Sequence, residues 1–149
     1  MDVTQPISSR RIDELLEHYA LSHRHPVNES IHFIAIPLIM LSLIGLMFCI
    51  HPLVAYGFVL ASMVYYLRLS LTFTLAMAIW SSALLALVIS MAEARLYICA
   101  VVFLGAWMLQ FIGHKLEGKK PSFFEDIQYL WVGPLFVLRP LLVKCHIAW

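Results

Sequence analysis

Residues 31–50 read IHFIAIPLIMLSLIGLMFCI, a run of twenty residues without a formal charge. An α-helix rises about 1.5 Å per residue, so a helix of this length matches a bilayer hydrocarbon core of about 30 Å. The stretch therefore predicts a membrane-spanning helix.

The composition of the whole chain indicates the same environment. Of its 149 residues, 62% are hydrophobic and 13% are charged, and the mean hydropathy is +0.85. Soluble domains are about half apolar and about a quarter charged. The length predicts a single membrane domain, residues 1–149. The net charge of +1 gives no field that would attract nucleic acid, and no nucleic-acid-binding motif is present.

Three further apolar runs predict three more spans, at residues 52–67, 69–91 and 96–112. The apolar stretch 127–138 is short and is interrupted by Pro134. We therefore predict that residues 121–149 form an interfacial or re-entrant tail. The predicted fold class is all-α, an integral membrane helical bundle of four spans, with a fifth span left open.

Before the first span, residues 9–25 predict an amphipathic surface helix. Apolar Ile12, Leu15, Leu16 and Tyr19 recur at helical spacing, and charged residues stand between them.

The distribution of cations predicts the topology. All but one fall before the first span, between the second and third, or after the fourth: Arg10, Arg11, Arg24, Arg68, Lys115, Lys119, Lys120, Arg139 and Lys144. The positive-inside rule then places both termini in the cytoplasm. The membrane is a bacterial inner membrane or the endoplasmic reticulum.

Three cysteines, Cys49, Cys99 and Cys145, lie in apolar surroundings without CxxC spacing. We interpret them as small buried hydrophobic residues, with a Cys49–Cys99 bridge left open.

Three histidines mark the membrane boundary. His23 and His32 flank the start of the first span, and His114 follows the fourth. An even number of crossings returns all three to one membrane face, whereas His51 lies on the other. Neutral imidazoles are the commonest metal ligands in proteins, so this pattern predicts a metal site at the lipid boundary.

A polar residue precedes each of these histidines by four positions: Tyr19, Asn28 and Gln110. On a helix, each pair shares a face, so the polar side chain could hold the free ring nitrogen or occupy a coordination position. The same residue types also anchor helices at the headgroup boundary. On the pattern alone, both interpretations stay open.

Charged residues near the histidines supply further candidates. Glu117 stands one helical turn after His114, and we interpret it as solvated or paired with a nearby cation, with a role as an extra ligand left open. The pair Lys119-Lys120 indicates attraction to anionic headgroups or a clamp for an acidic substrate such as a fatty acid.

Two motif blocks carry a family resemblance. They are His23-Arg-His-Pro-Val-Asn-Glu-Ser-Ile-His32 and Gln110-Phe-Ile-Gly-His-Lys-Leu-Glu-Gly-Lys-Lys-Pro121. The chain resembles, over residues 19–138, the small membrane dioxygenases that metabolise phytosphingosine-derived 2-hydroxy fatty acids to odd-numbered fatty acids. The resemblance implies an Fe(II)-dependent enzyme of fatty-acid α-oxidation, with a 2-hydroxy fatty acid and dioxygen as substrates. Homo-oligomer formation is left open.

The resemblance also implies residue roles. Catalysis and metal binding fall on His23, His32 and His114, while Tyr19, Asn28 and Gln110 occupy motif positions. Lys119 and Lys120 would meet the substrate carboxylate. His25 stays a candidate for an extra ligand or for a partner of a ligating ring, although it does not match a motif histidine. Glu117 stands one residue earlier than the glutamate of eukaryotic members. We expect the acyl tail to lie between the first and fourth spans.

Other classes fit less well. A histidine-box desaturase needs an HxxHH cluster, which this chain lacks, and a transporter needs ionisable residues near the midplane. A non-catalytic membrane lipid-binding or assembly protein stays the alternative.

Overall fold

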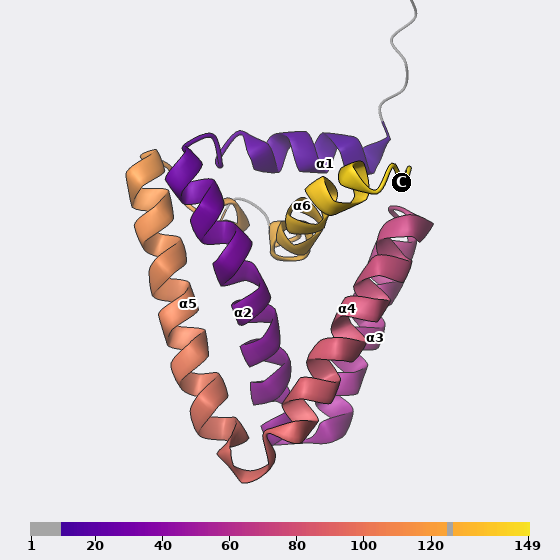
Figure 1. The fold of residues 1–149 in the computed structure, drawn as a ribbon, viewed down its shortest axis with the longest axis vertical. Helices are drawn as coiled ribbons and strands as arrows, with labels where there is room; N and C mark the ends of the chain where they lie inside the picture. Colours follow the sequence, from indigo (N-terminus) through magenta and orange to yellow (C-terminus); the bar gives the residue numbers. More distant parts are fainter. Residues whose placement is uncertain (1–9, 125–126) are drawn as a thin grey trace, which may run out of the picture.

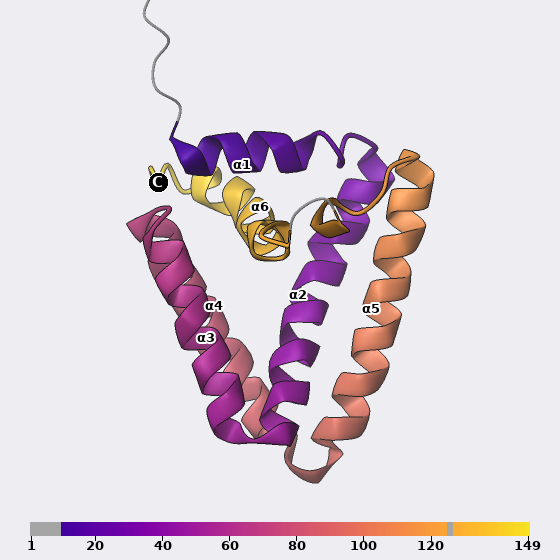
Figure 2. The same cartoon turned by 180° about the vertical axis from the view of Figure 1, so that it is seen from behind.

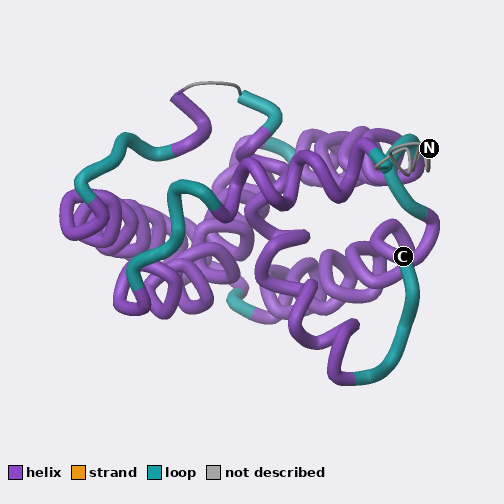
Figure 3. The backbone as a smooth tube through the Cα atoms, turned by 90° about the horizontal axis from the view of Figure 1, so that it is seen from above, coloured by secondary structure: helices purple, strands orange, loops and turns teal. Residues whose placement is uncertain are grey.

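The structure, a computed structural model, describes residues 10–124 and 127–149 (Figure 1). In these ranges the chain is all-helical, without strands, which confirms the all-α part of the predicted fold class. Figure 3 shows the short loops that join the helices. The elements are α1 (Arg11–Ala20), α2 (Pro26–Ile50), α3 (Pro52–Leu67), α4 (Leu71–Ser90), η1 (Ala92–Ala94), α5 (Arg95–Glu117), η2 (Ser122–Phe124) and α6 (Tyr129–Lys144). Residue 9, the predicted start of the first helix, lies outside the described residues.

The helices form a V with two arms (Figures 1 and 2). Helices α2 and α5 make one arm, and α3 and α4 make the other. The arms meet at the α2–α3 turn, where His51 lies, and α1 and α6 lie at the wide end. His51 accepts a hydrogen bond from the backbone N–H of Leu53 (3.2 Å) and so caps α3.

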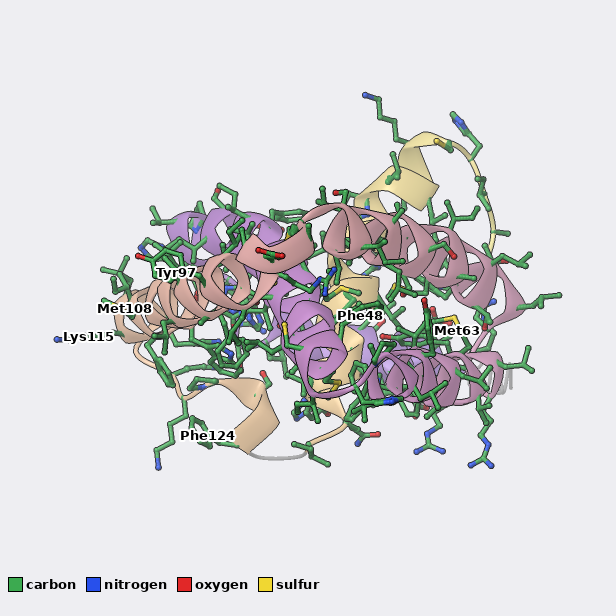
Figure 4. The ribbon with its side chains drawn as sticks, turned by 90° about the horizontal axis from the view of Figure 1, so that it is seen from below. Phe48, Met63, Tyr97, Met108, Lys115 and Phe124 are labelled. Atoms are coloured by element: carbon green, nitrogen blue, oxygen red, sulfur yellow. The ribbon has the colours of Figure 1, made fainter. Side chains whose placement is uncertain are left out.

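The outward surface of both arms is apolar. In the described chain, three helices are long and apolar enough to cross a membrane, namely α2, α4 and α5, while α3 is a shorter apolar helix. Ile79 is 74% exposed and Met108 is 64% exposed, and Tyr97 and Met108 lie on the outer side of α5 (Figure 4). Such a surface is unfavourable in water and favourable in lipid.

Helix α1 packs with its apolar face against the rest of the protein. Its apolar face, which includes Ile12, Leu16 and Tyr19, joins one core cluster with Val132 and Leu135 of α6. The C-terminal tail is also attached to α1, because the indole Nε1–H of Trp149 donates to a carboxylate oxygen of Asp13 (3.0 Å).

Helix α6 is longer than its apolar run. It passes through Pro134 and Pro140 without ending, although we expected an interruption there. Proline removes a helical hydrogen bond, but Val132 and Leu135 are fully buried, and their packing stabilises the helix across the site.

The cysteines differ from the prediction. All three are free, which removes the Cys49–Cys99 bridge, and only Cys99 is buried. Cys49 lies at the end of α2, while Cys145 follows α6, so neither is covered by a neighbouring helix.

Small residues let α2 and α5 pack closely. Ala35 and Ala106 are buried between them. Nearer the turn, Gly45 of α2 lies directly against the Sγ atom of Cys99. Without a side chain at position 45, the two backbones can approach each other, as is common between membrane helices.

We predict that Gly45→Ala destabilises the fold by about 1–3 kcal/mol, because the added methyl group collides with Cys99. Thermal unfolding in detergent would measure this. The matched control is Gly105→Ala on α5, where a Cβ atom meets nothing within 4 Å. Equal stability of the two variants would contradict the close packing at Gly45.

Candidate metal centre

His23, His32 and His114 converge at the wide end of the V. One ligand nitrogen from each lies within 4.8 Å of the other two, and all three side chains are buried. They come from the α1–α2 connection, from the start of α2 and from the end of α5. Residues far apart in the sequence therefore form one imidazole cluster.

The α1–α2 connection is short and well defined. The backbone N–H of His23 donates to the carbonyl of Ala20 (3.1 Å) and closes the end of α1. Pro26 then begins α2, and the His25 Nδ1 accepts a hydrogen bond from the N–H of Val27 (3.2 Å). Pro26 stands in the first turn of the helix, a position that favours proline. His25 lies at the exposed surface, away from the cluster.

Main-chain carbonyls orient two of the rings. The Nδ1–H of His23 donates to the carbonyl of Tyr19 (2.7 Å), and that of His32 donates to the carbonyl of Asn28 (2.9 Å). Since a carbonyl oxygen can only accept, each Nε2 is left with its lone pair free. For His23 and His32, the spacing of four residues thus brings each ring to a backbone carbonyl, a contact that we had not predicted.

The free nitrogens face one another. The Nε2 atoms of His32 and His114 are 3.1 Å apart. The Nε2 of His23 is buried and has no hydrogen-bond partner among the described residues. A buried polar atom without a partner is costly, and its presence indicates a ligand.

Burial keeps the centre uncharged. Burial and, to a smaller extent, the neighbouring His32 lower the pKa of His23 to about 3. The Tyr19 ring stacks on the His23 ring at 4.1 Å between centroids. Burial raises the pKa of Tyr19 well above its ordinary value, so its hydroxyl stays protonated.

This donor set fits a transition metal ion. Two ligands at a right angle that each lie about 2.1 Å from an ion are about 3.0 Å from each other, close to the observed distance between the His32 and His114 nitrogens. Three neutral imidazoles also leave coordination positions open for other ligands.

Glu117 has a different role from the one predicted. Its carboxylate accepts hydrogen bonds from the backbone N–H groups of Arg24 (3.0 Å) and His25 (2.7 Å). It also accepts one from the side-chain amide of Asn28 (3.2 Å). The end of α5 thereby holds the α1–α2 connection in place, and Glu117 is occupied with these donors.

Two further contacts complete this junction, and sequence reasoning missed both. The Asn28 oxygen lies directly against Gly113, where a side chain would collide with it. Gly133 of α6 leaves room for the Tyr19 hydroxyl. The only sequence signal for either is a glycine inside a helix.

The predicted lysines lie beside the centre. The Lys119 ammonium donates to the carbonyl of Leu21 (2.8 Å). An open cleft next to His114 is lined by both lysines and by Lys115, Phe111, Pro121 and Phe124. Lys115 extends outward from the end of α5, and Phe124 lies on the segment that follows it (Figure 4).

Fold and site define an all-helical, membrane-type protein with a buried histidine cluster that could hold a metal ion. Comparison with protein families agrees: residues 9–145 match the Mpo1-like family, described as 2-hydroxy-palmitic acid dioxygenase Mpo1-like. The chain belongs to this family, which confirms the resemblance inferred from the motifs. No curated protein and no solved structure matches the chain.

We predict that Glu117→Gln leaves the metal content unchanged and lowers stability by about 1 kcal/mol, because the hydrogen bonds lose a charged acceptor. Metal analysis and thermal unfolding of the purified protein would show this. Glu29→Gln, which alters a carboxylate near the start of α2 outside this junction, is the control. Loss of metal from Glu117→Gln alone would instead identify Glu117 as a ligand.

Proposed function

We propose that this protein is an Fe(II)-dependent dioxygenase that cleaves the C1–C2 bond of 2-hydroxy fatty acids and leaves a chain one carbon shorter. The buried cluster of His23, His32 and His114 is the observation that carries the proposal. Membership of a family described as a 2-hydroxy-palmitic acid dioxygenase supplies the reaction class.

The three histidines would hold the iron. Bound iron supplies the activation of dioxygen and positions for the substrate oxygens. The carbonyls of Tyr19 and Asn28 keep two imidazoles in the tautomer that a metal requires. The reaction balances without another reductant, since one 2-hydroxy acid and one dioxygen yield one shortened acid, one carbon dioxide and one water.

The lysine-lined cleft beside His114 suits the carboxylate of the substrate. Lys120 is exposed there, and Lys119 keeps two ammonium hydrogens after its bond to Leu21. A fatty acid at a membrane surface presents its carboxylate at the headgroup level, where these lysines would attract it.

We also propose that α2, α3, α4 and α5 all cross the membrane, with the metal centre and both termini on the cytoplasmic side. Helix α3 has 16 residues, about 24 Å in length. It runs beside α4 along the same arm (Figure 2). The cations support the orientation, because Arg95 is the only one in the chain between the third and fourth spans.

Iron content and activity test the enzyme proposal. We expect anaerobically reconstituted protein to bind iron and to convert 2-hydroxypalmitic acid to a chain-shortened acid with release of carbon dioxide. His23→Ala, His32→Ala and His114→Ala each remove a ligand, so activity falls by more than about 100-fold and iron is lost. His51→Ala and His146→Ala are controls that keep both. Iron-free wild-type protein, or iron unaffected by the three substitutions, would favour the non-catalytic lipid-binding alternative.

Labelling with a membrane-impermeant maleimide tests the topology. In a cysteine-free background, we expect Glu93→Cys, at the turn between α4 and α5, to react only from the outer side. The native Cys145 restored alone should react only from the cytoplasmic side. Reaction of both from one side would contradict four crossings.

A further inference from the structure

A long cavity starts at the metal centre and runs between the two arms. Its upper part is lined by His114, Gln110, Tyr19 and Ser122. From there it passes mainly apolar side chains of α2, α3, α4 and α6, and it reaches Ile44 and Val59 near the α2–α3 turn. The cavity has a volume of about 70 Å³, and part of it is open to the outside.

The polar groups of this cavity gather at the metal end. The Ser122 hydroxyl is buried and has no hydrogen-bond partner among the described residues. Tyr19 and Gln110 are also buried. The hydrogen bond that orients His23 uses the backbone carbonyl of Tyr19. The side-chain hydroxyl of Tyr19 is not used in this bond and is available to a ligand.

Below this end, several polar atoms of the wall bond to one another. The Trp131 Nε1–H donates to the Ser62 hydroxyl (2.9 Å), and that hydroxyl donates to the carbonyl of Phe58 (2.8 Å). The Tyr66 hydroxyl donates to the carbonyl of Trp131 (3.2 Å). These bonds fix α6 against α3 and leave the wall mainly apolar.

The cavity has a closed lower end. Ile44, Ala55 and Val88 form a core cluster there, and Val59 packs against it. Ile44 lies twelve positions after His32 along α2, which corresponds to a distance of about 18 Å at 1.5 Å per residue. A hydrocarbon core is about 30 Å thick, so one leaflet is about half of that. The distance from His32 to Ile44 is slightly more than the thickness of one leaflet.

We propose that this cavity is the acyl-chain channel of the enzyme, and that Ile44 and Val59 form the stop that sets the longest chain it accepts. The inference rests on the proposed function. The oxygenated end of the substrate lies at Tyr19, Gln110 and Ser122, next to the histidine cluster, and the tail extends toward the turn. The cavity has the polarity of a 2-hydroxy fatty acid, with one polar end and a long apolar remainder.

This position differs from the one expected from the sequence, between the first and fourth spans. Helices α2 and α5 are in contact along their buried small residues Ala35 and Ala106. The groove on their outer side, near Gly105 and Met108, contains no residue of the histidine cluster. A tail in that groove would not be continuous with the metal centre.

The stop is tested with a series of 2-hydroxy fatty acids of increasing length and the purified full chain in nanodiscs. We expect Val59→Phe to lower kcat/KM by about fourfold for each methylene group that no longer fits, and to leave short substrates unaffected. Val59→Ala should extend the longest acyl chain that is accepted. It keeps the test possible if Val59→Phe disturbs folding. Gly57→Phe, on the open face of the same helix, is the matched control and should leave the length preference unchanged.

A photoreactive diazirine at the terminal carbon of the substrate gives a readout independent of turnover. We expect labelling of residues around Ile44 and Val59, mapped by mass spectrometry. Labelling there without turnover in the wild-type protein would support the channel and overturn the proposed reaction. Turnover with labels along the outer groove at Gly105, or with a length preference that neither Val59 variant changes, would overturn the channel and leave the reaction standing.

Discussion

The close packing of α2 on α5 is the constraint on which the rest of the structure depends. It brings His32 within 3.1 Å of His114, although 81 residues separate them in the chain. Gly45 and Gly113 permit this approach at two levels, one against Cys99 and the other against Asn28. At the upper level, Glu117 joins the end of α5 to the α1–α2 connection, which carries His23. The helix contact therefore determines the positions of all three imidazoles.

Burial of these imidazoles depends on α1 and α6. A histidine cluster at a membrane boundary would ordinarily be hydrated, and its rings would then lie free of one another. Here Tyr19 of α1 stacks on His23, while Phe136 of α6 packs against the same ring. The two helices thus cover the cluster and limit the access of water, which sets the dielectric around an ion bound there.

The sequence predicted much of this, and the limits have physical reasons. Uncharged runs of membrane length predicted the all-helical fold, and the positions of His23, His32 and His114 relative to those runs predicted their convergence. The carbonyl contacts of His23 and His32 were not predicted, because a sequence pattern does not distinguish a side chain from the backbone carbonyl at the same position. The partners of Glu117 were also missed, since backbone N–H groups carry no sequence signal. The path of α6 through two prolines depended on tertiary packing, which local propensity does not report.

On the proposed function, the V shape would let a metal ion held by the histidine cluster act on a substrate whose tail lies between the arms. Four parallel helices packed as a closed bundle would fill the space beneath the cluster with side chains. Because the arms diverge from the Ile44–Ala55–Val88 cluster, and α6 fills only the wide end, space remains between them on the side of His114. An amphiphile can then keep its polar end at the histidines while its tail stays in an apolar environment, so binding exposes no part of the tail to water. On the proposed function, the divergence of the arms would therefore serve substrate binding.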